Sequence, residues 1–333
     1  MADILLDVRD LKKYFRSPQG MVHAVDGVTF TIERGKTLGI VGESGCGKST
    51  VGRCLLRLLE PTSGQVIFEG VDISKADRRE MKKLRKEMQM IFQDPYSSLN
   101  PRKTVGDIIA EPLIHNRLVT GGKDAVEKRV KELMDTVGLA ERLYHSYPHE
   151  LDGGRRQRVG IARALAMEPT FIVCDEPVSA LDVSIQAQIL NLLKKLQREI
   201  GLTFIFITHD LSVVNYFSDD IVVMYLGQIV EKAPSEELFA HPMHPYTQAL
   251  LSAIVVPEIG KRRERIRLRG EVSSPLDPPD ECRFKKRCNY ACEECRQGTP
   301  PLIEVSPNHF VACHCIGPGR NTLKETVQQE DKA

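Results

Sequence analysis

The N-terminal part of the sequence alternates between hydrophobic and polar residues. The alternation runs from about Leu5 to Ile32 and is interrupted at Ser17–Gly20, a segment that contains a proline and a glycine. A period of two residues is typical of strands with one buried face, and a segment with proline and glycine is typical of a turn. The pattern therefore predicts antiparallel strands joined at this turn.

Other segments are hydrophobic at nearly every position or at helical spacing. The runs Phe171–Cys174 and Phe204–Thr208 predict strands of a parallel sheet that is buried on both faces. Three further strands are predicted at Thr37–Val41, Val66–Phe68 and Met224–Val230, the last with a glycine at its turn. Helices are predicted from Lys48 onward and over Lys75–Lys86, Asp124–Val137 and Ile185–Ile200.

The character of the sequence changes after Pro257. A basic run, Lys261–Arg269, is followed by the segment SSPLDPP and then by six cysteines between Cys282 and Cys315. The basic run is interpreted as a solvated face, with contact to lipid headgroups as the alternative. We expect three regions: a main domain over residues 1–257, a Pro- and Cys-rich extension over 258–320, and a disordered polar tail over 321–333.

Composition narrows the classes of function. The chain has 333 residues and a formal net charge of only +1, which gives no general attraction to nucleic acid or anionic lipid. The first residues are acidic and interrupted by charges, so no signal peptide is expected. The longest apolar runs are too short to cross a bilayer, and we expect work at a membrane to depend on a partner that supplies the membrane part.

The segment from Gly42 to Thr50 fits the phosphate-binding pattern G-x-x-x-x-G-K-[ST], with a predicted strand before it and a predicted helix after it. In this pattern, backbone N–H groups surround the phosphates and the helix N-terminus adds partial positive charge. We expect Lys48 to reach the β- and γ-phosphates of ATP and the Ser49 hydroxyl to ligate Mg²⁺. The candidate nucleotide contacts are Gly42, Glu43, Ser44, Gly45, Cys46, Gly47, Lys48, Ser49 and Thr50.

Two acidic residues follow the buried strand Phe171–Cys174. Asp175 is suited to hold Mg²⁺ through water, and Glu176 is suited to act as a general base on an attacking water. Strands often end in acidic residues. This pair, however, follows a phosphate loop by about 130 residues, which favours a catalytic role.

At this point the sequence resembles the ABC transporter ATPases. The stretch Leu151–Leu165, LDGGRRQRVGIARAL, resembles the family's signature motif and lies just before the Asp-Glu strand, as in the family. The resemblance covers Leu5 to about Lys232 and includes an adenine-stacking aromatic residue, the Q-loop glutamine, a D-loop residue and the switch histidine: Tyr14, Gln93, Asp182 and His209. Packing of the tyrosine against strands is the structural alternative to its stacking on adenine.

The resemblance implies a fold. It is an α/β fold with a P-loop NTPase core, an antiparallel β subdomain, a helical subdomain over about residues 94–165 and a small Cys-rich C-terminal extension. Two ATP molecules would bind between two such domains in head-to-tail arrangement. Asp152, Gly153 and Gly154 of the signature would face the γ-phosphate held by the partner.

The resemblance also implies roles for single residues. His209 would contact the γ-phosphate and orient the water together with Glu176. Gln93 would sense the Mg²⁺ ion and pass that state to a membrane subunit. Lys48, Glu176 and His209 are therefore the catalytic candidates, and Ser49, Gln93 and Asp175 are the magnesium candidates.

A narrower resemblance is to the dipeptide, oligopeptide and nickel import subfamily. It rests on FQDPYSSLNPRKTVGDIIAEPL, on HPYTQALLSAI and on the Pro- and Cys-rich tail, and it covers nearly the whole chain. It implies the ATP-hydrolysing subunit of a peptide importer at the cytoplasmic face of the cell membrane. The implied partners are a homologous ATPase subunit in a homo- or heterodimer, two membrane permease subunits and an extracytoplasmic peptide-binding protein, with no nucleic acid.

The cysteine cluster is interpreted as a metal site, because a reducing compartment is expected and disulfides are rare there. The subfamily resemblance implies a four-iron, four-sulfur cluster on Cys282, Cys288, Cys295 and Cys313, spaced C-x5-C-x6-C-x17-C. Zinc is the alternative, because Cys292 and Cys295 form a C-x2-C pair. No role follows for Cys292 or Cys315.

Asp152 stands where the ABC family normally has serine, and an ionised aspartate can only accept hydrogen bonds. One hypothesis is a weak composite ATP site in a heterodimer, because the carboxylate would face a polyanion. The other is compensation. As a good N-cap, Asp152 would turn back to its own helix, and Arg155, where the family usually has glutamine, would neutralise it or reach the phosphate itself.

Two other functions use a phosphate loop. The main alternative is a soluble ABC ATPase that acts on nucleic acid or ribosomes. The chain has one cassette, however, and the 58 residues between Gln93 and Asp152 are too few for a coiled-coil arm. A P-loop kinase would need an acceptor site and has no use for the signature motif. The sequence thus favours a transport ATPase.

Overall fold

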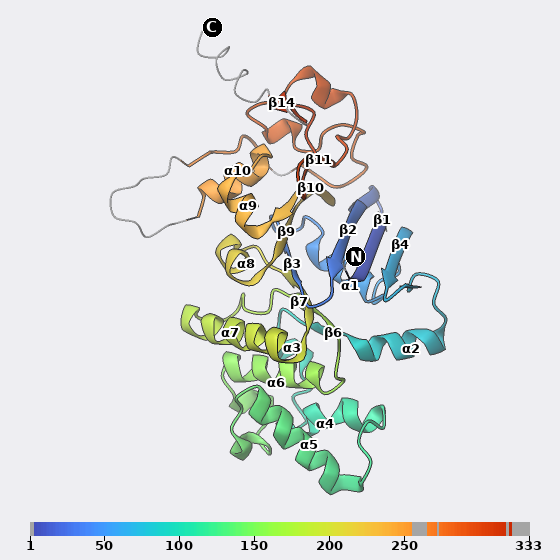
Figure 1. Cartoon of the computed structure of the whole chain (residues 1–333), viewed down its shortest axis with the longest axis vertical. Coiled ribbons are helices and arrows are strands. Elements are labelled where there is room, and N and C mark those ends of the chain that lie inside the picture. The colour runs from blue at the N-terminus through green and yellow to red at the C-terminus, as the bar shows by residue number, and fades with distance from the viewer. Residues whose placement is uncertain (1–2, 255–264, 272, 318–319, 322–333) are drawn as a thin grey trace, which may run out of the picture. The chain divides into compact units, whose positions relative to one another are not determined.

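The computed structural model describes residues 3–254, 265–271, 273–317 and 320–321 (Figure 1). The described residues form two compact units. Unit 1 contains Glu33–Lys36 and Lys75–Ile207, and unit 2 contains residues 3–32, Thr37–Ser74 and the described residues from Thr208 onward. No helix in the described ranges combines the length and the apolar character needed to cross a bilayer.

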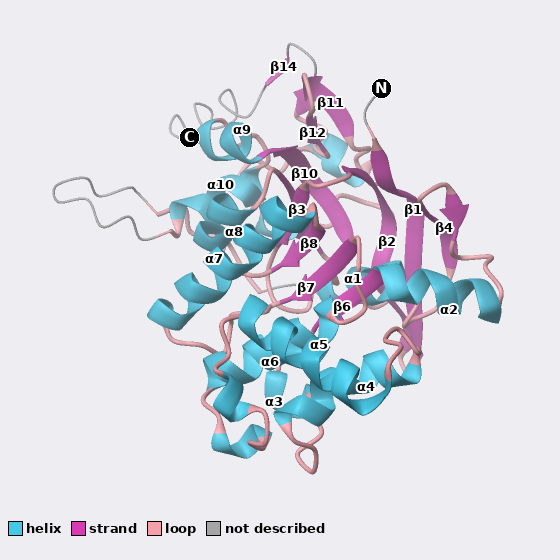
Figure 2. Ribbon diagram, turned by 60° about the horizontal axis from the view of Figure 1, so that its bottom comes forward, coloured by secondary structure: helices cyan, strands magenta, loops and turns pink. Residues whose placement is uncertain are grey.

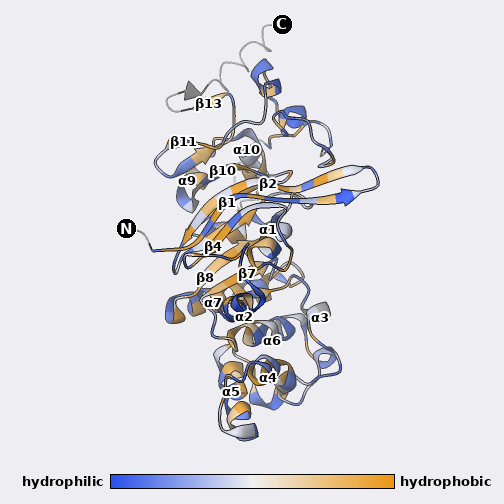
Figure 3. Ribbon diagram, turned by 90° about the vertical axis from the view of Figure 1, so that its right-hand side faces the viewer, coloured by the Kyte–Doolittle hydropathy of each residue, from blue (hydrophilic) through white to orange (hydrophobic). Residues whose placement is uncertain are grey.

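Unit 1 contains three parallel strands in the order β8-β7-β6. They are β6 (Met88–Ile91), β7 (Phe171–Asp175) and β8 (Thr203–Ile207), and every residue of β7 and β8 is buried. Figure 3 shows hydrophobic colour concentrated on β7 and β8. The uninterrupted apolar runs in the sequence therefore form strands covered on both faces, as predicted.

Helices α4, α5 and α6 of unit 1 pack against one another and are drawn in cyan in Figure 2. Side-chain caps set several helix starts. Asp77 accepts the N–H groups of Arg79 and Glu80, so the helix predicted from Lys75 begins at Arg78. The helices and short 3₁₀ turns of unit 1 are α2 (Arg78–Glu87), α3 (Pro95–Ser98), α4 (Val105–His115), α5 (Gly122–Thr136), η1 (Glu141–Leu143), η2 (Pro148–Glu150), α6 (Gly153–Leu165) and α7 (Val183–Ile200).

Unit 2 contains an antiparallel sheet in the order β2-β1-β4-β5. The strands are β1 (Ile4–Ser17), β2 (Gly20–Glu33), β4 (Ser63–Phe68) and β5 (Val71–Asp72). Strands β1 and β2 are joined at the predicted turn, and β1 pairs with β4. The alternation of the sequence thus corresponds to a sheet with one buried face.

A second group of strands in unit 2 has the order β11-β12-β10-β9-β3. They are β3 (Thr37–Val41), β9 (Asp220–Tyr225), β10 (Gln228–Pro234), β11 (Ile303–Ser306) and β12 (His309–Val311). Strand β9 is parallel to β3, whereas β10 and β12 are antiparallel to their neighbours. The C-terminal strands therefore extend a group of strands that begins with β3.

The single strand predicted over Met224–Val230 is instead a hairpin. Strand β9 ends at Tyr225, and β10 begins at Gln228. Leu226 and Gly227 between them have φ values of 42° and 81°, which a tight hairpin turn requires at both central residues. The glycine of this turn was recognised in the sequence. The other turn residue, Leu226, is apolar and gave no sign of a hairpin.

The remaining elements of unit 2 are short and are joined by loops. The predicted boundary at Pro257, residues 261–264 of the basic run and the predicted tail, apart from Asn321, lie outside the described residues. The short elements are α1 (Lys48–Leu55), α8 (Leu211–Phe217), α9 (Ser235–Ala240), α10 (Pro245–Ser252), η3 (Lys285–Arg287), η4 (Glu293–Arg296), β13 (Ile316–Gly317) and β14 (Arg320–Asn321).

Candidate nucleotide-binding site

The phosphate-loop pattern forms a tight turn between β3 and α1 in unit 2. Gly47 has φ 105°, and a Cβ at this position would lie 2.0 Å from the carbonyl oxygen of Ala24. Only glycine fits there. Helix α1 starts at the next residue without a side-chain cap and without an acidic residue in its first turn. This end of the helix is therefore electrostatically suited to an anion.

Lys48 is buried within the loop. Its Nζ donates to the carbonyl oxygens of Gly42 at 2.7 Å and Glu43 at 3.0 Å. These contacts hold the ammonium group at the inner side of the turn. Phosphate oxygens would be stronger acceptors for the same amine, because they carry negative charge and the carbonyl oxygens do not.

The motif HPYTQALL contacts the phosphate loop and supports it. Tyr246 of α10 is fully buried, and its hydroxyl accepts the backbone N–H of Glu43 at 2.9 Å. His244 caps the same helix, since its Nδ1 accepts the Tyr246 N–H at 3.1 Å. Burial lowers the pKa of His244 to about 4, which keeps the ring neutral and its Nδ1 an acceptor. The motif thus fixes one end of the phosphate loop.

A second contact reaches the loop from the Cys-rich region. Arg287 is buried and binds the carboxylate of Glu43 through both terminal nitrogens, at 2.7 and 3.0 Å. Such a two-point contact fixes the orientation of the carboxylate and neutralises its charge. Arg287 also lies over the ring of Tyr225.

Tyr14, the candidate for stacking on adenine, is held by side chains around it. Its ring stacks on His23 with centroids 4.0 Å apart, and its hydroxyl donates to Asp26 at 2.5 Å. Asp26 also binds Arg283 and His23. Burial raises the pKa of Asp26, but these hydrogen bonds outweigh it, and the pKa lies below its usual value. His23 covers one face of the ring, so adenine would use the other.

In unit 1, the acidic pair lies at the end of β7. Asp175 is 2% exposed, and Glu176 follows it with φ 47°, a left-handed conformation that is uncommon for glutamate. The Glu176 N–H donates to Ile207 O at 2.9 Å, and its carboxylate accepts from Gln93 Nε2 at 2.8 Å. Strained backbone of this kind occurs preferentially at functional sites.

The signature residues stand at the start of α6. Asp152 is the N-cap, and its Oδ1 accepts the Arg155 N–H at 2.8 Å. The Arg155 side chain also pairs with Asp152 Oδ2 at 3.3 Å. Both features of the compensation hypothesis are therefore present. Asp182 plays the same capping role for α7, where it accepts the Ile185 N–H at 3.0 Å.

His209, the switch candidate, belongs to unit 2. It is exposed and follows Thr208, directly before the N-cap Asp210 of helix α8. Asp210 accepts the Ser212 N–H at 2.8 Å. The imidazole is thus exposed on a turn, and the capped start of helix α8 fixes the position of that turn.

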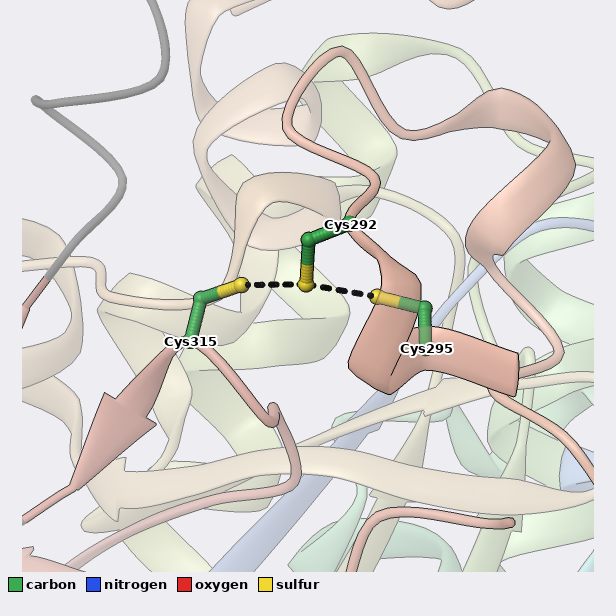
Figure 4. Close-up of side chains that lie close together, drawn as sticks. All are labelled: Cys292, Cys295 and Cys315. Carbon is green, nitrogen blue, oxygen red and sulfur yellow. Dashed lines mark hydrogen bonds between the residues drawn. The ribbon is translucent and has the colours of Figure 1, made fainter. Parts of the chain in front are cut away.

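All nine cysteines lie within the described residues, and all are free thiols. The sulfur atoms of Cys292, Cys295 and Cys315 lie within 4.8 Å of one another. Figure 4 shows their side chains converging. Cys292 is 3.5 Å from Cys295 and 3.1 Å from Cys315, sulfur to sulfur. Only Cys295 of this trio is among the four predicted ligands. Cys292 and Cys315, for which the sequence indicated no role, are therefore close enough to share an ion.

The donor chemistry around the trio is that of thiols. Burial raises the pKa of Cys288 and of Cys313 to about 12, so these groups would need a nearby cation to be held as thiolates. His314, between two cysteines in the sequence, has its Nε2 3.0 Å from Gly298 O instead. A set of thiols without histidine fits a soft metal centre, either iron–sulfur or zinc.

Comparisons with known proteins decide the family. The sequence matches the family described as ABC transporter over residues 25–179, and that described as oligopeptide/dipeptide transporter, C-terminal region, over residues 230–295. It is 53% identical over 314 residues to the putative oligopeptide transport ATP-binding protein YkfD of Bacillus subtilis (strain 168), with 93% of this chain and 95% of that protein covered. The chain belongs to the ABC transporter ATP-binding family.

Two further relatives agree with this assignment. The oligopeptide transport ATP-binding protein AppF of Bacillus subtilis (strain 168) is 51% identical over 325 residues, covering 94% of this chain and 97% of that protein. A solved structure of the ATP-binding cassette MJ0796, a dimer in a post-hydrolysis state bound to ADP and Pi, has a TM-score of 0.64 at 31% identity. It covers 69% of this chain and 98% of that one. The predicted ABC ATPase fold is thus confirmed, and the chain is an ATPase.

The structure divides the predicted site residues of this ABC ATPase between the two units. Within unit 1 it joins Gln93 to Glu176, and within unit 2 it surrounds Lys48 with its own loop. The role of each residue stays a prediction. Unit 2 holds Tyr14, the loop from Gly42 to Thr50, His209 and the four predicted cluster cysteines, and unit 1 holds Gln93, Asp152, Gly153, Gly154, Asp175, Glu176 and Asp182.

Sequence reasoning missed four residues near the nucleotide loop of this ABC ATPase. Asp26, Tyr246, Arg283 and Arg287 all contact predicted nucleotide-binding residues or their partners. The two arginines carried a signal, because they lie between Cys282 and Cys288 in the run CRFKKRC. That run was interpreted only as a source of metal ligands.

Proposed function

We propose that this ABC ATPase powers the import of short peptides across the cytoplasmic membrane. Support comes from its relatives, which are named oligopeptide transport ATP-binding proteins, and from the matched C-terminal transporter region. The observation that carries the proposal is that this same region supports the phosphate loop, through the contact of Tyr246 with Glu43. The matched transporter region and the phosphate loop both belong to unit 2.

We further propose the roles of the catalytic residues. Lys48 binds the β- and γ-phosphates, and Glu176 takes a proton from the attacking water while His209 orients that water. Ser49, Gln93 and Asp175 would hold Mg²⁺, which neutralises charge on the phosphates. The buried carboxylate of Asp175 fits this oxygen-seeking ion.

The proposed assembly has two ATPase subunits, two membrane permease subunits and an extracytoplasmic peptide-binding protein, with the ATPases on the cytoplasmic face of the membrane. ATP bound between two ATPase subunits stabilises their association, and hydrolysis releases them. Whether the second ATPase subunit is another copy or a relative is decided by co-purification of the intact complex.

We also propose that the cysteines bind a four-iron, four-sulfur cluster, with Cys282, Cys288, Cys295 and Cys313 as ligands. Support comes from the all-thiol donor set and from the absence of a disulfide among these described cysteines. The role is structural, because a short Pro-rich segment buries too little apolar surface to fold alone. Such a centre would hold the segment that carries Arg283 and Arg287.

The test is peptide uptake by vesicles that contain the reconstituted complex. We expect labelled di- or oligopeptides to accumulate only with ATP inside the compartment that the ATPase faces, and not in a complex carrying Lys48→Ala. ATP hydrolysis without peptide accumulation for any peptide length would contradict the import function while leaving the ATPase assignment intact.

A further inference from the structure

The run Cys282–Cys288, CRFKKRC, places two arginines between two cysteines, and we call it the arginine segment. Its centre is fixed in the core of unit 2. Phe284 is 2% exposed and packs edge-on against Tyr225, with ring centroids 5.2 Å apart. At its start, the Cys282 N–H donates to Cys295 O at 3.0 Å. The segment is thus connected both to the core and to the cysteine trio.

The side chains of the two arginines contact two different parts of the predicted nucleotide site. Arg287 binds the carboxylate of Glu43 inside the phosphate loop. Arg283 binds Asp26, which accepts the hydroxyl of Tyr14, and the carbonyl oxygen of Leu226. One short segment therefore contacts both the phosphate loop and the partner of the adenine-stacking candidate.

The contact between Arg287 and Glu43 affects nucleotide binding because Glu43 is negatively charged. A carboxylate within a phosphate loop repels a triphosphate unless a cation neutralises it. Arg287 does so with two hydrogen bonds in a buried position, where a charge interaction is stronger than at the surface. Lys286, the adjacent basic residue, is exposed and has no contact of this kind among the described residues.

The chain of residues 275–277 adds a third connection. Leu276 forms a β-bridge with Val22, and the His23 N–H donates to Pro275 O at 2.9 Å. His23 is the residue on which Tyr14 stacks. The C-terminal region thus contacts Asp26 directly through Arg283 and contacts the backbone of Val22 and His23, the second of which stacks on Tyr14.

We propose that the arginine segment couples the cysteine centre to nucleotide binding: Arg287 positions and neutralises Glu43, Arg283 positions Asp26, and ATP binding and the order of the segment stabilise each other. The coupling is reciprocal. If order in the arginine segment raises the affinity for ATP by some factor, ATP binding must favour the ordered segment by the same factor. The inference rests on ATP binding at this loop and holds for either metal in the cysteine centre.

The first test measures the affinity of the full-length protein for AMP-PNP by calorimetry. We expect Arg287→Gln to weaken binding roughly tenfold, because the carboxylate of Glu43 is then unpaired beside the phosphates. Adding Glu43→Gln to that variant should recover most of the loss, since the repelling charge is removed. The matched control Lys286→Gln removes an adjacent positive charge and should change the affinity less than about twofold.

The outcomes of this test are distinct. Unchanged affinity in Arg287→Gln, or no recovery in the double variant, would overturn the coupling, because simple misfolding of the segment is not repaired by Glu43→Gln. If the unmodified protein does not bind AMP-PNP, the nucleotide site fails and the inference fails with it. A Lys48→Ala variant supplies the baseline without nucleotide binding.

The second test measures the reverse direction. Hydrogen–deuterium exchange of the backbone amides of residues 283–287 is followed in the protein with its metal centre, with and without AMP-PNP. We expect AMP-PNP to slow this exchange several-fold in the unmodified protein and not in Lys48→Ala. Strand β7 of unit 1, in which every residue is buried, is the internal control. Equal slowing in β7 would indicate global stabilisation only, and this result, like unchanged exchange in residues 283–287, would overturn the proposal.

Discussion

Gln93 and Glu176 lie 83 residues apart in the sequence and are joined by one hydrogen bond, in which the amide Nε2 donates to the carboxylate Oε2 over 2.8 Å. Glu176 is also fixed by its backbone, which donates to Ile207 O. The candidate base is therefore oriented by a residue from the loop after β6. Gln93 can hold the carboxylate in place as well as respond to the metal ion.

Gln93→Ala should lower the rate of ATP hydrolysis by about tenfold, because the carboxylate of Glu176 loses the donor that orients it. The affinity for AMP-PNP measured without Mg²⁺ should change little, because the proposed metal contact of Gln93 is then not used. The measurement is steady-state phosphate release together with calorimetric binding. Gln93→Asn keeps an amide on a shorter side chain and is the matched variant. Its rate of ATP hydrolysis should lie between those of the unmodified protein and Gln93→Ala. Wild-type turnover in Gln93→Ala would show that the hydrogen bond has no catalytic role.

Asp152→Ser should leave ATP-driven dimerisation and hydrolysis within about twofold of the unmodified protein. Serine is as good an N-cap as aspartate, so the start of α6 stays intact and only the charge changes. The removed charge is already balanced by Arg155. Arg155→Gln alone should lower dimerisation at low salt, and the double variant should restore it. A several-fold rise in hydrolysis on Asp152→Ser would instead support the weak-site hypothesis.

Protein purified without oxygen should be brown and contain iron and acid-labile sulfide at about four atoms each per chain. Single serine variants of the six clustered cysteines then identify the ligands. Loss of colour is expected for Cys282, Cys288, Cys295 and Cys313 and retention for Cys292 and Cys315. A colourless protein with one zinc per chain would reverse the choice of metal, and the sulfur trio would then be the first ligand set to examine.

The pair of His309 and Glu231 should make the stability of the C-terminal strands depend on pH. Both side chains are fully buried, with His309 Nε2 2.7 Å from Glu231 Oε1. Burial lowers the pKa of His309, but the contact with Glu231 outweighs it, so the pKa is raised above the ordinary 6.5. A raised pKa contributes stability that is complete below pH 6.5 and is lost as the pH rises through the folded-state pKa.

His309→Gln should flatten this pH dependence and lower the free energy of unfolding at pH 6 by about 3 kcal/mol, because it leaves a buried charge without its partner. Thermal melts between pH 5.5 and 8.5 provide the comparison. His241→Gln removes an exposed histidine that pairs with Glu237 and serves as the control. An unchanged slope in His309→Gln would show that the pair does not control stability.

Much of the fold could be predicted from the sequence, because local patterns determine it. The alternation of Leu5–Ile32 and the uninterrupted runs at β7 and β8 each correspond to one kind of strand. The glycine of the turn at Leu226 and Gly227 was recognised, but the segment was predicted as one strand because the other turn residue is a leucine. Hydrophobic periodicity does not locate a turn that contains an apolar residue.

Candidate site residues could be named from the sequence where the proposed chemistry requires a residue type at a fixed spacing, as for Lys48 and Glu176, and their roles stay predictions. The supporting contacts could not be named, since Arg287 and Glu43 are 244 residues apart and no local pattern relates them. Asp152 is an intermediate case. Its capping role and its pairing with Arg155 were one of two hypotheses that the sequence left open, and the side-chain geometry shows both contacts.

The central claim, that ATP holds two copies of this kind of domain together until Glu176 promotes its hydrolysis, is tested most directly by Glu176→Gln. The substitution keeps the shape and the hydrogen bonding of the side chain but removes its basicity. Gel filtration with and without ATP, combined with phosphate release, is the measurement, and the protein is run with its partner ATPase if co-purification identifies one. We predict retained ATP binding, turnover reduced at least a hundredfold and a dimer that appears only with ATP. Unchanged hydrolysis in Glu176→Gln, or no ATP-dependent dimer when turnover is abolished, would contradict the account.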